Sequence, residues 1–152
     1  MKILHLITGV LCGVLITGFA HEPSHALFAY YLGLTITEYL PLQAVYTIGV
    51  NIPNYAIALT AAAPYLLSMS VGLLSVIFNR KSLFWRGFSI PLIFQQLPKF
   101  FIPELEPVRG FQISNGDWLT IQYAGTLYAL AYIITCVGFS ASWLILTLRN
   151  KR

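Results

Sequence analysis

Four apolar runs dominate the sequence and determine the solvent in which the chain folds. They cover residues 3–20, 57–78, 88–102 and 119–148. A helix that crosses a bilayer needs roughly 20 mostly apolar residues, and three of the runs approach or exceed that length. The composition agrees, because 57% of the residues are hydrophobic and only 9% are charged, with a mean hydropathy of +0.73. We therefore expect a single integral membrane domain that covers residues 1–152.

The pattern within the runs predicts an all-α polytopic fold with about four transmembrane helices. Residues 3–32 read as one long helix or two abutting helices, with Gly33 as the stop signal. Residues 34–50 alternate and are rich in β-branched side chains, which predicts a short strand or hairpin after the first helix.

The later runs are less regular. Residues 56–78 predict the second span, while the run at 88–102 carries prolines, glutamines and a lysine, which predicts a short broken span or a re-entrant piece lining a cavity. The last helix should start near Asp117 and run for about 30 residues, long enough to require tilt or a break near Gly138.

The basic residues indicate how the chain is oriented in the membrane. Four spans would place seven of them on one side: Lys2, Arg80, Lys81, Arg86, Arg149, Lys151 and Arg152. By the positive-inside rule that side is cytoplasmic, so both termini should be cytoplasmic, and we expect a bacterial or archaeal plasma membrane. The net charge of +4 is spread along the chain without forming a patch, which argues against nucleic acid as a partner. The expected partners are membrane lipid and a membrane-protein or peptide substrate.

One motif in the chain carries recognisable chemistry. Residues 21–25 spell His-Glu-Pro-Ser-His, the H-E-x-x-H pattern. On a helix the two histidines point the same way and can chelate one zinc ion, while Glu22 can reach a water molecule on that ion as general base. Pro23 leaves an alternative open, because a helix could begin at this proline, and the two histidines would then not need to chelate.

A catalytic zinc site needs a third protein ligand and one open position. Counting the helical rise from Ile3 places His21 about 27 Å along the first helix, near the non-cytoplasmic interface, and Asp117 lies at the same level. We favour Asp117, with Glu104 and Glu106 as alternatives in the preceding loop. Ser114-x-x-Asp117 also reads as a helix capping box, which needs no metal.

These residues resemble a known family. The H-E-x-x-H segment followed by Ala26-Leu27 and Gly33, the strand-like stretch, Thr60-Ala61-Ala62-Ala63-Pro64 on a helix and a later Asp117 are similar in order to the site-2 protease family, of which this chain would be a remote or separate branch. The resemblance implies an intramembrane zinc metalloprotease that hydrolyses peptide bonds of membrane-associated substrates. It implies Zn²⁺ as the cofactor, with His21, His25 and Asp117 as ligands.

Three other interpretations remain. The protein could be a non-enzymatic small membrane protein, such as a helper subunit or an inactive protease relative, in which the polar cluster only packs helices. Residues 1–20 also resemble a signal peptide, whose cleavage would leave His21 as the N-terminus. Metal transport ranks last, because it would require acidic residues or histidines distributed through the spans.

Overall fold

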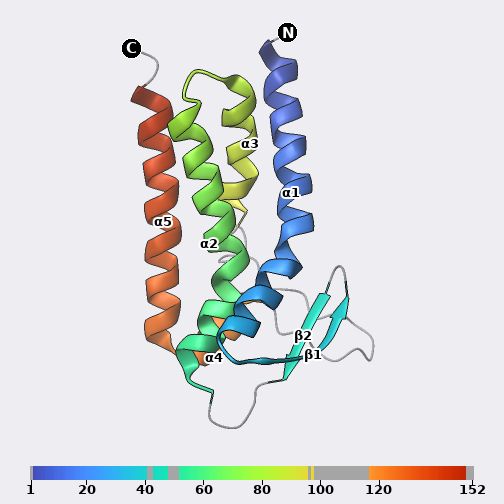
Figure 1. The fold of residues 1–152 in the computed structure, drawn as a ribbon. Helices are drawn as coiled ribbons and strands as arrows, with labels where there is room; N and C mark the ends of the chain where they lie inside the picture. Colours follow the sequence, from blue (N-terminus) through green and yellow to red (C-terminus); the bar gives the residue numbers. More distant parts are fainter. Residues whose placement is uncertain (1, 41–42, 48–51, 96, 98–116, 150–152) are drawn as a thin grey trace, which may run out of the picture.

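The chain forms a bundle of helices with a small hairpin at one end (Figure 1). The computed structural model describes residues 2–40, 43–47, 52–95, 97 and 117–149. Within them the elements follow in the order α1 (Lys2–Tyr31), β1 (Thr35–Leu40), β2 (Gln43–Thr47), α2 (Asn54–Phe78), α3 (Leu83–Phe94), α4 (Asp117–Ala124) and α5 (Thr126–Leu148).

Three of these helices are long and apolar enough to cross a membrane. They are α1, α2 and α5, with 30, 25 and 23 residues. These three candidate spans indicate an integral, multi-pass membrane protein.

The run at 88–102, predicted to be a short broken span or a re-entrant piece, begins within a short helix. Helix α3 has 12 residues, and at 1.5 Å per residue it is about 18 Å long, which is less than the roughly 30 Å hydrocarbon core. It begins before the apolar run, because the Ser82 hydroxyl accepts a hydrogen bond from the backbone N–H of Trp85 as an N-cap. Most of the run beyond Phe94 lies outside the described residues.

Helix α1 continues through the H-E-x-x-H motif. Pro23 lies inside the helix, and Figure 1 shows α1 bending in its second half, as expected where a proline removes one backbone hydrogen bond. The helix ends at Tyr31, where Gly33 adopts a positive φ of 76° and the N–H of Leu34 bonds back to the Ala29 carbonyl. The predicted stop at Gly33 is therefore confirmed, and it is a glycine C-cap.

The strand-like stretch forms a two-stranded antiparallel hairpin. The register pairs Thr35 with Thr47 and Leu40 with Gln43, with an irregularity between Ile36 and Glu38. This is the strand or hairpin that the alternating pattern predicts after the first helix.

The predicted final helix is broken, but not at the predicted residue. The break falls at Gly125, whose φ of 139° is a conformation that residues other than glycine rarely adopt. It separates the short α4 from α5. Gly138, where we expected tilt or a break, lies within α5. A glycine inside a helix does not need to bend it, whereas a positive φ must interrupt it.

The bundle has one basic end. The start of α1, the connection between α2 and α3, and the end of α5 lie together in Figure 1, opposite the hairpin. These segments carry Lys2, Arg80, Lys81 and Arg149. Arg86 belongs to the same end, since its guanidinium donates two hydrogen bonds to the Arg80 carbonyl, at 3.0 and 2.8 Å.

Helices α1 and α3 touch through their backbones. A Cβ atom added at Gly9 would overlap the Phe84 carbonyl oxygen, and one added at Gly87 would overlap the Leu6 carbonyl oxygen. Gly9 and Gly13 form a G-x-x-x-G pair, the spacing that lets two membrane helices approach closely. The short α3 is thereby fixed along the first half of α1.

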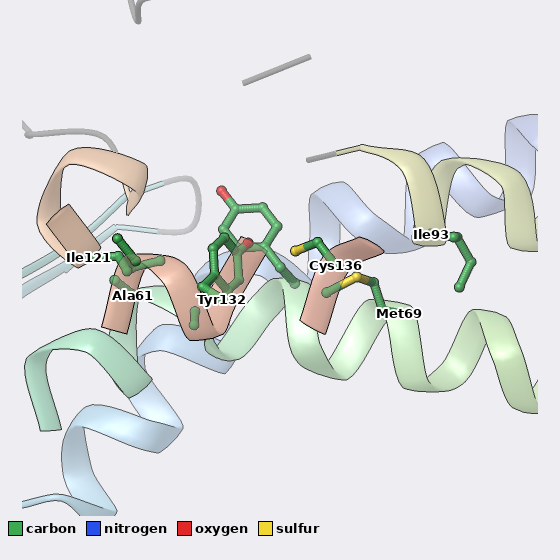
Figure 2. Packing of buried hydrophobic residues seen from close by; sticks show 9 residues of the cluster. Ala61, Met69, Ile93, Ile121, Tyr132 and Cys136 are labelled. Atoms are coloured by element: carbon green, nitrogen blue, oxygen red, sulfur yellow. The ribbon is translucent and has the colours of Figure 1, made fainter. Parts of the chain in front are cut away.

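On the other side of α2, a buried apolar cluster joins the remaining helices. Figure 2 shows Met69 of α2 beside Cys136 of α5, with Ile93 of α3 and Ile121 of α4 at its two ends. The Trp143 indole adds a polar link, because it donates a 2.6 Å hydrogen bond to the Ser89 hydroxyl.

The glycine contact predicts a sharp difference between two similar substitutions. Gly9→Ala should lower the free energy of unfolding by about 1–3 kcal/mol, because the new methyl group meets backbone atoms that cannot yield. Gly138→Ala is the matched control, since nothing lies within 4 Å of its added Cβ. Thermal unfolding in detergent measures both variants, and equal midpoints would contradict the close approach of α1 and α3.

Candidate metal centre

Two helices bring the predicted metal-ligating residues to one place. His21 and His25 lie one turn apart on α1, and Asp117 is the first residue of α4. The Nε2 atoms of the two histidines are 3.2 Å apart. The Asp117 carboxylate bridges them, with Oδ1 at 3.2 Å from His25 Nε2 and Oδ2 at 3.3 Å from His21 Nε2.

The His25 ring is held from its other side by α2. Its Nδ1 lies 2.8 Å from the backbone carbonyl oxygen of Thr60, and only 2% of the residue is exposed. A carbonyl oxygen can only accept a hydrogen bond, so the proton of this contact belongs to Nδ1. In the neutral ring, Nε2 then carries the lone pair and faces the bridging carboxylate.

The arrangement therefore brings several hydrogen-bond acceptors close together. When the His25 ring is neutral, its Nε2 and both Asp117 oxygens are acceptors, and His21 Nε2 lies within hydrogen-bond distance of them. Acceptors so close together are favoured only with a cation among them, or with protons on the imidazole nitrogens.

The spacing also fits zinc. Ligand atoms about 2.0–2.1 Å from a tetrahedral zinc ion lie roughly 3.3 Å from one another, by simple geometry. The two histidine nitrogens are 3.2 Å apart, and each lies within 3.3 Å of a different oxygen of Asp117. With one ligand atom taken from each residue, the three atoms lie within 4.8 Å of one another. Two imidazoles and one carboxylate are a ligand set that zinc accepts, and three protein ligands leave the fourth position open. The residues present therefore fit a catalytic type of zinc site.

Tyr65 of α2 completes the surroundings of the carboxylate. Its hydroxyl donates a short hydrogen bond to Asp117 Oδ2, and its ring packs edge-to-face on His21 with centroids 5.0 Å apart. The side chain is almost fully buried, at 1% exposure. Tyr65 thus orients Asp117, as partners of ligating carboxylates do in metal sites.

The charge state of Asp117 follows from these contacts. Burial raises the pKa of its carboxyl, but hydrogen bonds from His21, His25 and Tyr65 and the charge of His25 outweigh burial and hold the pKa well below its ordinary range. Asp117 is therefore ionised at neutral pH, as a ligating carboxylate must be.

Glu22 lies beside this group on the wall of a cleft. One carboxylate oxygen, Oε1, is 4.0 Å from His21 Nε2. The cleft has a volume of about 390 Å³ and is lined by His21, Glu22, Tyr65 and Gln95, together with Val14, Thr17 and Gly18 of α1. The predicted base therefore lines the same cleft as one of the predicted ligands.

The structure does not test the alternatives to Asp117. Glu104, Glu106 and the capping residue Ser114 fall outside the described residues. Among the described residues, His21, His25 and Asp117 form a group that could hold a metal ion. Thr60 and Tyr65 were not predicted from the sequence as contacts of these three residues. Pro64, which precedes Tyr65, was a local signal of an irregular helix near them.

Comparison with known proteins assigns the chain to no family. No model of a protein family matches the chain, and no curated protein or solved structure matches it. The resemblance to site-2 proteases rests on the residues quoted above.

The Tyr65 contact predicts a measurable loss of stability. Tyr65→Phe removes a hydrogen bond to a charged acceptor and should lower the free energy of unfolding by about 1.5–3 kcal/mol. Tyr55→Phe is the control, because Tyr55 lies on the same helix and is half exposed. Thermal unfolding of the metal-free variants in detergent checks this, and equal losses for both would argue against the Asp117 contact.

Proposed function

We propose that this protein is an intramembrane zinc metalloprotease, a remote or separate branch similar to the site-2 proteases. His21, His25 and Asp117 would hold Zn²⁺, and Glu22 would be the general base. The observation that supports this most is the convergence of His21, His25 and Asp117: the two imidazole nitrogens are 3.2 Å apart, and each lies within 3.3 Å of an Asp117 oxygen. The substrate class is a membrane-associated protein or peptide.

The chain's own residues suit hydrolysis of a peptide bond. Zinc, when bound, would supply a Lewis acid that acidifies a water molecule and polarises the scissile carbonyl. Glu22, on the cleft wall, would take the proton of that water as its oxygen attacks the carbonyl carbon. The same carboxyl would then give the proton to the leaving amine, so that the products are a carboxylic acid and an amine.

The basic end of the bundle supports a topology in a bacterial or archaeal plasma membrane. Lys2, Arg80, Lys81 and Arg149 at one end favour that end, and with it both termini, on the cytoplasmic side. The metal group would then lie toward the opposite face. Reporter domains that are active on only one side of the membrane, fused after Asn79 and at the C-terminus, should both report the cytoplasm. Opposite results at the two positions would refute this topology.

A second candidate, a non-enzymatic helper subunit or inactive protease relative, has one observation in its favour. The Asp117 carboxylate already accepts a hydrogen bond from Tyr65 and lies within 3.3 Å of both histidines. With protons on the imidazoles, this cluster could join helices α1, α2 and α4 without a metal. Metal content separates the two candidates.

The zinc proposal predicts which variants lose the metal. The purified wild type should contain about one zinc ion per chain, and His25→Ala and Asp117→Ala should each weaken zinc binding by more than the roughly 10–100-fold typical of outer contacts. His5→Ala is the control, because His5 lies in the first turns of α1, away from the group. Elemental analysis and competition with a chelator measure this, and equal zinc in all four proteins would reject the ligand assignment.

The base assignment predicts a variant that binds zinc but does not cleave. Glu22→Gln keeps the ligands and removes the proton acceptor, so cleavage of labelled casein should fall by about 10²–10⁴-fold with zinc content unchanged. His5→Ala again serves as the control. Cleavage at the wild-type rate by Glu22→Gln would show that this carboxylate is not the base.

A further inference from the structure

The Thr60 carbonyl that holds His25 is unusual for its place in a helix. It lies inside α2 and Thr60 is 1% exposed, yet it accepts a hydrogen bond from a side chain of another helix. In a regular α-helix this oxygen would accept from the backbone N–H four residues later. The residue at that position is Pro64, which has no N–H.

The proline also changes the direction of the carbonyl. A proline ring inside a helix clashes with the carbonyl four residues earlier, which opens the helix and tilts that oxygen away from the axis. In a membrane span, an oxygen freed in this way must find another donor, because lipid offers none. Here the donor is the His25 Nδ1–H at 2.8 Å.

A comparison within the chain shows that this arrangement is not general for its helical prolines. Pro23 of α1 removes the partner of the Phe19 carbonyl in the same way, but Phe19 is 75% exposed on the outside of the bundle. At Pro64, by contrast, the freed carbonyl accepts a hydrogen bond from His25, a residue of the metal group.

We infer that Pro64 is a positioning residue of the metal centre. By withholding an N–H from the Thr60 carbonyl, it reserves that oxygen for His25 Nδ1–H. The bond fixes the orientation in which His25 Nε2 faces His21 and Asp117. The inference applies to the metal-free chain, so only the zinc-binding measurement described below rests on the proposed function.

The test compares two proline substitutions in zinc-free protein. Pro64→Ala restores the N–H beneath Thr60, whereas Pro91→Ala, the control, restores one in α3 that faces the Gly87 carbonyl. NMR of ¹⁵N-histidine-labelled protein in detergent detects the Nδ1–H of His25 and its hydrogen bond. The wild type and Pro91→Ala should show a hydrogen-bonded, slowly exchanging Nδ1–H, and Pro64→Ala should lose this signal.

Zinc binding and unfolding provide the second and third readouts. Pro64→Ala should weaken zinc binding by about 10–100-fold, the effect expected for loss of an outer contact of a ligand. Its unfolding midpoint should be equal to or above that of the wild type, since a restored helix bond does not destabilise α2. A merely structural proline would give the reverse pattern, with lower stability and an unchanged Nδ1–H signal.

The outcomes separate this inference from the proposed function. A wild-type spectrum without a hydrogen-bonded Nδ1–H, or a Pro64→Ala spectrum identical to that of the wild type, would overturn the inference. Loss of this signal in Pro64→Ala, together with a wild type that binds no zinc, would support the inference and reject the proposed protease. Should Pro64→Ala fail to fold, Pro64→Gly restores the same N–H, and the same two spectral criteria apply to it.

Discussion

The contact on which the site depends is the carboxylate of Asp117 between two imidazole rings. It joins α1 to α4, and Tyr65 adds α2 through the same carboxylate. A negative charge in an apolar bundle is costly unless partners surround it, and the two histidines and the tyrosine are those partners. Each of the three helices must therefore be in place before the charge of Asp117 is compensated.

Local spacing made much of this site predictable. Residues four apart on a helix share a face, so H-E-x-x-H implied that His21 and His25 would lie together, and they do. The rise of a helix placed Asp117 at the level of His21, and the structure brings their side chains within 3.3 Å. That these residues bind zinc remains a proposal, since proximity alone does not prove it.

The parts that were not predictable depend on tertiary contacts or on backbone conformation. His25 bonds to the Thr60 carbonyl 35 residues away, and Tyr65 bonds to Asp117 52 residues away. The periodicity of a sequence does not predict pairs so far apart in the chain. The break in the last helix is at Gly125, not near Gly138, because only a positive φ at one of them interrupts the hydrogen bonding. Hydropathy suggested a fourth span at 88–102, but the Ser82 cap starts α3 earlier and the helix is short.

The backbone contact between α1 and α3 has a mechanical consequence. Glycines 9 and 87 leave no side-chain layer between these two helices, so α1 and α3 should move together. Helix α3 also contacts α2 and α5, through Ile93 in the apolar cluster and through the Ser89–Trp143 hydrogen bond. An ion held by His21, His25 and Asp117 would link the second half of α1 to α4, so that both halves of α1 would be fixed to the rest of the bundle.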